Sequence, residues 1–204
     1  MDKWYHGTTL QGWKDICKYG VLSDYNKGYE LDFGYGFYLT PIQQHAENYI
    51  IDSLKFEESD INVGIPFIEN KDDKIPVLIE FTFNPIQWYS DHCYNFHFLN
   101  AYDDEFAEFV FHNRINNING NCQHNYDVIF GVMSDSLPTV LIQKYNRGEI
   151  SKEEVLTGLK KSTSNKQLSL HNQEICDIIK PSKAILIDSR EELNVNDYIR
   201  SYSC

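Results

Sequence analysis

Two short glycine-containing segments contain the histidine and tyrosine side chains that could bind a ligand. The first, YHGTT at residues 5–9, places the imidazole of His6 beside Gly7. The second, GFYLTPIQQHAENY at residues 36–49, contains Tyr38 and, eleven residues later, Tyr49. A glycine lets the backbone approach a flat ligand closely. Two tyrosine rings facing each other would form aromatic walls, so these segments predict a slot for a planar heterocycle that bears an amide.

The triplet Asp32-Phe33-Gly34 suggests a different chemistry, because protein kinases use an Asp-Phe-Gly motif to hold magnesium. A kinase also needs a glycine-rich phosphate loop, a strand lysine and a histidine-arginine-aspartate loop before that motif. Only 31 residues precede Asp32, and they contain none of these parts. The kinase interpretation is therefore rejected, and Asp32 and Gly34 are expected to form a turn beside the slot.

Composition sets the broad class of the protein. A chain of 204 residues that is 42% hydrophobic and 14% aromatic predicts a single domain over residues 1–204, with room for two small lobes. The net charge of −12 opposes broad, non-specific attraction to nucleic acid. The sequence has neither a secretory apolar run at its start nor about 18 uninterrupted apolar residues. A cytoplasmic protein without a membrane partner is expected.

The pattern of apolar residues predicts alternating short strands and helices. Strands are expected at residues 3–6, 37–39, 77–83, 128–133, 167–170 and in the AILID run that follows Pro181. Helices are expected up to Gly20, from Pro41 after a Thr40 N-cap, over 103–115, as two consecutive helices over 137–161, and over 172–179. Residues 57–76 are expected to form an exposed loop. The sum is an α+β chain.

At the His-Gly-Thr and DFGYGFYLT segments, the sequence resembles the NAD-dependent ADP-ribosyltransferase superfamily, on the His-Tyr-Glu side shared by diphtheria toxin and the poly(ADP-ribose) polymerases. EFVFHNR at 108–114 and YDVIFGVMSD at 126–135 look most like a bacterial group of toxin-like enzymes, some encoded beside an antitoxin. The resemblance implies an ADP-ribosyltransferase-like α+β fold, with two small, mainly antiparallel sheets around an NAD cleft and flanking helices.

The resemblance also implies roles for individual residues. His6 would hydrogen-bond the ribose hydroxyls of NAD, and Gly7 would hold the nicotinamide carboxamide through its backbone. Tyr38 and Tyr49 would enclose the nicotinamide ring. The NAD contacts implied in this way, by residue number, are His6, Gly7, Thr8, Phe37, Tyr38, Tyr49 and Arg114, the last through the pyrophosphate or an acceptor phosphate.

The third catalytic position of the resemblance is occupied by an unexpected residue. The family pattern has a glutamate on a later strand, where this sequence has Gln167. Glutamine can hydrogen-bond a ribose, but it takes no proton and carries no full charge, so poly(ADP-ribose) elongation is not expected. Gln173 and Glu174 remain alternatives if the strand register differs, and Glu108 is a more remote one. The catalytic set is therefore His6, Tyr38 and Gln167.

The function expected from these residues is mono-ADP-ribosyl transfer from NAD to a protein or nucleic acid, by a bacterial intracellular toxin with a cognate antitoxin partner. An NAD glycohydrolase would use the same residues with water as acceptor. A non-catalytic module that binds NAD or ADP-ribose is the third possibility, because Gln167 replaces the family glutamate. His92, Cys93 and His97 lack two spaced ligand pairs for zinc, so no metal is expected.

Overall fold

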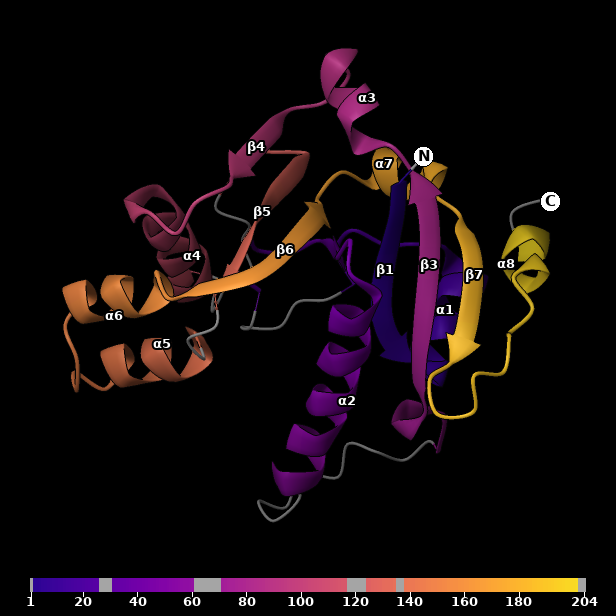
Figure 1. The fold of residues 1–204 in the computed structure, drawn as a ribbon, viewed down its shortest axis with the longest axis horizontal. Helices are drawn as coiled ribbons and strands as arrows, with labels where there is room; N and C mark the ends of the chain where they lie inside the picture. The colour runs from indigo at the N-terminus through magenta and orange to yellow at the C-terminus, as the bar shows by residue number, and fades with distance from the viewer. Residues whose placement is uncertain (1, 26–30, 61–70, 117–123, 135–137, 202–204) are drawn as a thin grey trace. The chain divides into compact units, whose positions relative to one another are not determined.

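Two small sheets, each assembled from strands far apart in the sequence, organise the chain (Figure 1). The computed structural model describes residues 2–25, 31–60, 71–116, 124–134 and 138–201. Within these residues the strands are β1 (Asp2–Thr9), β2 (Phe37–Leu39), β3 (Pro76–Phe83), β4 (Phe96–Leu99), β5 (Val128–Ser134), β6 (Ser162–Leu170) and β7 (Pro181–Leu186). The helices are α1 (Leu10–Tyr19), α2 (Gln43–Asp60), a short 3-10 helix (Lys71–Lys74), α3 (Pro85–Ser90), α4 (Asp104–Asn116), α5 (Pro138–Asn146), α6 (Lys152–Leu159), α7 (Gln173–Ile178) and α8 (Asn196–Ser201).

The sheets have the strand orders β1-β3-β7 and β2-β6-β5-β4. β3 pairs antiparallel with both β1 and β7, and β5 pairs antiparallel with β6 and parallel with β4. The chain is therefore α+β with two small, mostly antiparallel sheets and flanking helices, as the sequence predicts. Among the described residues, no helix is long and apolar enough to cross a membrane.

Contacts between Cα atoms divide the chain into two compact units. Unit 1 contains residues up to 22, residues 39–84 and residues from 176 onward, and unit 2 contains residues 23–38 and 85–175. Each unit holds one of the two sheets, apart from Leu39 at the end of β2, which falls in unit 1. The two units are described separately below.

The core of unit 1 lies on both faces of the β1-β3-β7 sheet. On one face, Ala46 and Ile50 of α2 pack against Leu78 of β3 and Ile185 of β7. Side chains alternate between the faces of a strand, so the next residue of β3, the fully buried Ile79, lies on the other face. The α1 helix contacts β1 and β3 and lies behind the sheet in the view of Figure 1.

Gly7 allows α2 to lie close against β1. A Cβ atom added at Gly7 would lie 2.2 Å from the backbone oxygen of Ala46 and 3.2 Å from the Cβ of Ile50. Only glycine therefore fits at this point of β1 without a shift of the helix. The glycine of the His-Gly pair thus has a packing role within unit 1 in addition to any contact with a ligand.

The core of unit 2 lies between its sheet and helices α4, α5 and α6. Val110 of α4, Ile142 of α5 and Val155 of α6 are buried in one cluster with Ile129 of β5. The fully buried Phe33, which precedes β2, belongs to the same cluster. The loop before β2 is thus anchored in the main core of this unit.

Most predicted elements are confirmed. The first helix ends at Gly20, whose N–H bonds the carbonyl of Ile16 at a positive φ of 83°. The predicted capping box at the start of α6 is present, with Ser151 and Glu154 bonding each other's backbone N–H groups. The short segments α3, β4 and α8 are not predicted by the sequence pattern, because none of them has a long apolar periodicity.

The predicted start of α2 is wrong. The helix begins at Gln43, and Thr40 is not its N-cap but forms an isolated bridge with Tyr5, with N–H···O distances of 2.8 and 2.9 Å. The bridge holds Thr40 extended, because both of its backbone groups pair with β1. The hydroxyl of Thr40 accepts a bond from the N–H of Ile42 instead.

The buried face of α2 contains an acid beside its apolar residues. Ala46 and Ile50 are buried, and Ile42 and Tyr49 are exposed. Glu47 is also buried and accepts two hydrogen bonds from Arg190, at 2.6 and 3.0 Å. These hydrogen bonds hold the pKa of Glu47 below its usual range. The predicted loop at 57–76 is wrong at both ends, because α2 continues to Asp60 and a 3-10 helix covers Lys71–Lys74. Residues 61–70 of that prediction lie outside the described residues.

The close approach at Gly7 predicts a large effect of a single methyl group. Gly7→Ala is expected to lower the free energy of unfolding by about 1–3 kcal/mol, because the helix backbone must move. Gly158→Ala is the control, since its methyl meets mainly the flexible end of Leu141 within a helix that favours alanine. Urea unfolding followed by circular dichroism measures both. Equal effects of the two variants would contradict the packing role of Gly7.

Candidate functional site

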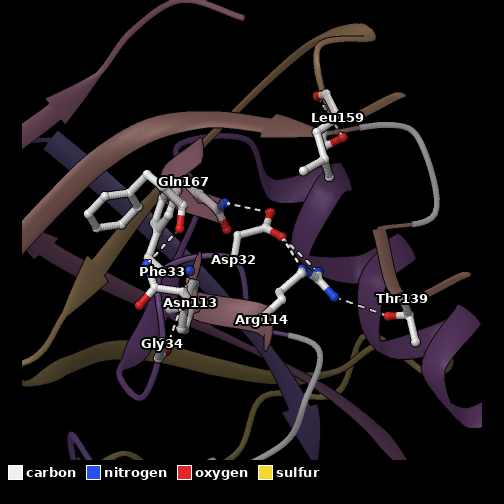
Figure 2. A network of polar contacts seen from close by, with 11 residues as sticks. Asp32, Phe33, Gly34, Asn113, Arg114, Thr139, Leu159 and Gln167 are labelled. Carbon is white, nitrogen blue, oxygen red and sulfur yellow. Dashed lines mark hydrogen bonds and ion pairs between the residues drawn. The ribbon is translucent and has the colours of Figure 1, made fainter. Parts of the chain in front are cut away.

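The loop before β2 in unit 2 forms hydrogen bonds with several elements that are distant in sequence. Residues 31–34 are all buried, although the segment has no regular secondary structure. A buried loop must satisfy its backbone and side-chain polar groups within the protein, because water does not reach them. The partners come from α4, β2, β6 and the segments that flank β5 and β6, and Figure 2 shows several of them.

The carboxylate of Asp32 forms a buried ion pair with Arg114. The Nε and Nη2 atoms of Arg114 lie 2.8 and 2.7 Å from Oδ1 of Asp32, and Nη1 donates to the hydroxyl of Thr139 at 3.1 Å (Figure 2). Asp32 is 8% exposed and Arg114 is 5% exposed. Removing one member of such a pair leaves a buried, uncompensated charge, which is strongly destabilising. Arg114, which the resemblance assigns to a phosphate, therefore has a structural partner within unit 2.

Gln167 is the third member of this network. It lies on β6, is 7% exposed, and its Nε2 atom donates to Oδ2 of Asp32 at 3.3 Å (Figure 2). The two carboxylate oxygens of Asp32 thus bind different partners, Arg114 on one side and Gln167 on the other. The predicted third catalytic residue is tied to the loop that precedes the predicted catalytic tyrosine.

Tyr38 is fixed by its hydroxyl group. The hydroxyl accepts a hydrogen bond from the N–H of Phe33 at 3.0 Å and donates one to the carbonyl of Gly34 at 2.7 Å. The ring stacks on Phe33, with a centroid distance of 6.4 Å, and meets the edge of His171 at 6.5 Å. Tyr38 is half-buried, and its hydroxyl stabilises the loop.

His171 holds the second half of the loop. Its Nδ1 atom bonds the carbonyl of Tyr35, and its Nε2 atom lies 2.8 Å from the hydroxyl of Ser169. A carbonyl only accepts, so Nδ1 carries the proton and Nε2 accepts from Ser169. A Cβ atom at Gly36 would lie 2.9 Å from the His171 ring, which explains why this position is a glycine.

His124 supports the first half of the loop in the same manner. Its Nε2 atom donates to the carbonyl of Phe33 at 2.7 Å, and its Nδ1 atom accepts from the N–H of Tyr126 at 3.2 Å. The ring lies edge to face with His171 at a centroid distance of 4.6 Å. Both histidines use one donor and one acceptor, and this pattern requires the neutral form of each ring.

The surroundings favour these neutral forms. Burial lowers the pKa of His171 to about 3, and the nearby His124 ring acts in the same direction. Burial also lowers the pKa of His124. The hydrogen bond to the Tyr35 carbonyl and the charge of Asp127 oppose this lowering of the His171 pKa, and each has a smaller effect than burial. The loop is thus held by two uncharged imidazoles at neutral pH.

The remaining predicted NAD contacts are divided between the two units. In unit 1, His6 and Thr8 are half-buried on β1, Gly7 is buried, and Tyr49 of α2 is 53% exposed. Tyr49 therefore does not belong to the core of unit 1. Phe37 of β2 is buried.

The alternatives for the third catalytic position have other partners. Gln173 accepts hydrogen bonds from the backbone N–H and the hydroxyl of Ser23, at 3.0 and 3.2 Å. The backbone N–H of Glu174 bonds the side chain of Asn172, and Glu108 forms an ion pair with Lys152 at 2.8 Å. Gln167 contacts the loop before β2 through the carboxylate of Asp32.

Sequence reasoning missed three polar residues of this network. Asp32 was expected to form a turn only, and His124 and His171 were not assigned a role. The role of Asp32 could have been predicted, because this acid lies between the apolar residues Leu31 and Phe33. An aspartate that is buried with its apolar neighbours needs a partner for its charge. No local pattern indicates the two histidines, because their partners are backbone carbonyls distant in sequence.

The fold is α+β with two small sheets, and the candidate site is a polar network around a buried loop. These features do not identify an activity. The model of DUF3990, a family of proteins of unknown function, matches residues 5–180. The chain belongs to this family. No curated protein and no solved structure matches it.

The hydroxyl bonds of Tyr38 predict a stability effect that is separate from any ligand contact. Tyr38→Phe is expected to lower the free energy of unfolding by about 2 kcal/mol, because it leaves the Phe33 N–H and the Gly34 carbonyl without this partner. Tyr89→Phe at an exposed tyrosine is the control and is expected to change it by less than about 0.5 kcal/mol. Urea unfolding measures both variants. An unchanged midpoint for Tyr38→Phe would contradict the proposed role of its hydroxyl.

The two neutral histidines predict that unit 2 loses stability in mild acid. The pKa of His171 is near 3 in the folded protein and about 6.5 in the unfolded chain, so between these values the unfolded chain binds more protons. The free energy of unfolding should therefore fall as pH drops below about 6.5, by about 2 kcal/mol from His171 between pH 7 and pH 5.

His171→Asn tests this assignment, because the asparagine amide can still donate to the Tyr35 carbonyl but does not titrate. The variant should lose about 2 kcal/mol less than the wild type between pH 7 and pH 5 in urea unfolding. His112→Asn, at an exposed histidine of α4, is the matched control. The assignment fails if both variants keep the pH dependence of the wild type.

Proposed function

We propose that this protein is a mono-ADP-ribosyltransferase with an ADP-ribosyltransferase-like fold, which transfers ADP-ribose from NAD to a protein or nucleic acid. The proposal includes the role of an intracellular bacterial toxin with a cognate antitoxin. The combination of the His6-Gly7-Thr8 segment with DFGYGFYLT and the spaced Tyr49 supports it. The two-sheet α+β architecture is compatible with it.

The observation that carries the proposal is the way in which the Tyr38 ring is held. The hydroxyl donates its proton to the buried loop and accepts a hydrogen bond from it, and these two bonds fix the direction of the ring. A ring fixed in advance stacks on a planar heterocycle at little entropic cost. Nicotinamide is planar and bears an amide, which matches the slot predicted from the sequence.

The proposed reaction breaks the bond between nicotinamide and its ribose. The bonding electrons leave with nicotinamide, and positive charge develops on the sugar as an oxocarbenium ion. A nucleophile of the acceptor then bonds to the sugar carbon and loses its proton to solvent. The protein would accelerate this reaction by holding NAD in a geometry closer to the transition state than to free NAD, with the nicotinamide stacked on Tyr38. The resemblance implies further contacts of Tyr49 with the nicotinamide and of His6 with the ribose.

A binding module that does not turn over NAD is the second candidate. Gln167 favours it, because an amide bonded to the Asp32 carboxylate provides no general base and no full negative charge for the developing cation. An NAD glycohydrolase differs from the transferase only in the acceptor. Measurement of nicotinamide release with and without an acceptor separates all three candidates.

The exposed Tyr49 provides the sharpest test of the proposal. Tyr49→Ala is expected to reduce nicotinamide release from NAD about tenfold, because it removes one stacking surface. Its free energy of unfolding should change by less than about 0.5 kcal/mol, since the side chain is 53% exposed. Release is measured with the purified protein, with and without cell lysate as the source of acceptor.

Tyr19→Ala is the matched control, because Tyr19 is 52% exposed on α1 of the same unit. It should release nicotinamide as fast as the wild type. Release that depends on Tyr49 and rises with lysate supports the transferase, and release that ignores lysate selects the glycohydrolase. NAD binding without release by the wild type leaves the binding module, and neither binding nor release would refute the NAD assignment.

A further inference from the structure

The outer edge of β4 offers backbone hydrogen-bonding groups to another strand. β4 is the last strand in the order β2-β6-β5-β4, and among the described residues no strand pairs with its other side (Figure 1). The N–H of Val128 bonds the carbonyl of Asn95 at 3.2 Å, next to the parallel pairing of β4 with β5. In a parallel pair, every second residue directs its backbone groups to the partner strand. His97 therefore faces β5 like Asn95, whereas Phe96 and Phe98 direct their N–H and C=O groups to the outer edge.

The sequence of β4 lacks the side chains that commonly protect an edge. Folded proteins often place charged residues or proline on an edge strand, because these residues oppose pairing with another chain. The four residues Phe96 to Leu99 include neither a proline nor a side chain that is charged at neutral pH, because burial lowers the pKa of His97. The edge is therefore chemically suited to the addition of a strand.

The two faces of β4 differ in their surroundings. Side chains alternate between the faces of a strand, so His97 and Leu99 lie on one face and Phe96 and Phe98 on the other. Leu99 is buried in the core cluster with α4, α5 and α6. On the opposite face, the rings of Phe96 and Phe98 stack at 5.9 Å, and Tyr89 of α3 contacts them at 5.5 and 5.1 Å. Tyr89 is 48% exposed and the two phenylalanines are half-buried, so apolar surface lies beside the edge on this face.

The surroundings of β4 are acidic. Residues 84–113, which include α3, β4 and most of α4, contain five acids and neither lysine nor arginine. Lysines of α6 pair with two of these acids, Asp104 and Glu108. The carboxylate of Glu105 lies 3.7 Å from the neutral His97 ring, and its side chain is 67% exposed. Basic side chains on the His97 face of an added strand would complement this charge. A second copy of the chain, with a net charge of −12, or a nucleic acid would be repelled.

We propose that the outer edge of β4 binds an extended segment of another protein, which alternates apolar with basic residues and adds to the sheet as a strand. The apolar side chains of this segment pack on Phe96, Phe98 and Tyr89. Its lysine or arginine side chains lie beside Glu105 on the other face. The outward N–H and C=O groups of β4 supply the main-chain hydrogen bonds, which is the usual source of affinity in strand addition. The inference is independent of the proposed function, because no contact with NAD enters into it.

The direct test is amide hydrogen exchange, followed by NMR, with and without a short peptide that alternates valine and lysine. Saturating peptide should slow exchange at the amides of Phe96 and Phe98 by about tenfold or more, because these N–H groups become bonded. Exchange at His97 and Leu99, whose N–H groups face β5, should change by less than about twofold. Equal protection of all four amides, or no protection at the highest soluble peptide concentration, would overturn the inference.

The requirement for a basic partner is tested with Glu105→Gln and Glu153→Gln. Both glutamates are exposed and each is the second residue of a helix in unit 2, but Glu153 lies on α6. In fluorescence anisotropy at low salt, Glu105→Gln should weaken binding of the valine-lysine peptide about threefold, and Glu153→Gln should weaken it less than about 1.5-fold. A peptide that alternates valine and glutamate should bind at least about tenfold more weakly to the wild type. Equal effects of the two variants, or equal affinities of the two peptides, would contradict the assigned chemistry of the partner.

Other occupants of the edge give distinguishable results. Protection of Phe96 and Phe98 without peptide, rising with protein concentration together with a dimer in sedimentation, would assign the edge to a second copy of the chain. Protection by single-stranded oligothymidylate and not by the valine-lysine peptide would indicate stacking of bases on the aromatic rings. Either result would refute the proposed partner.

Discussion

The buried carboxylate of Asp32 is the constraint on which the organisation of unit 2 depends. A charge that is more than nine-tenths buried must be paired, and the partner that the chain provides is Arg114, 82 residues later on α4. This ion pair ties the loop before β2 to a helix of the main core. The second carboxylate oxygen binds Gln167 and ties the same loop to β6. One side chain thus connects a loop, a helix and a strand.

The backbone carbonyls of the loop, like the Asp32 carboxylate, are buried polar groups that need partners. The carbonyls of Phe33, Gly34 and Tyr35 are each bonded by a side chain, from His124, Tyr38 and His171 respectively. A segment without regular structure can be buried only when such partners exist. Two of these partners are histidines that must stay neutral, so the stability of the loop depends on pH, whereas the Asp32–Arg114 pair requires charge. Unit 2 therefore combines an ionised and a neutral polar network around one loop.

Local patterns predicted the elements that local interactions form. The capping box of Ser151 and Glu154 involves residues three apart, and the sequence shows it directly. The N-cap at Thr40 failed although its local pattern is equally good, because a bridge to Tyr5 uses the Thr40 backbone. The pairing of Asp32 with Arg114 spans 82 residues and has no sequence signature. Prediction thus reached most of the elements, but not the bonds that connect Asp32 to Arg114 and Gln167.

The same residues stabilise the fold and form the candidate site, and this double role determines which variants are informative. Asp32, Tyr38 and Gln167 all support the buried loop, so truncation of any of them to alanine would disturb folding and ligand contacts together. A loss of activity in such a variant would not identify a ligand contact. Substitutions that keep the shape and exchange one polar function separate the two effects, because the core packing is retained. Tyr49 is the opposite case, since its exposed ring can be removed without opening the core.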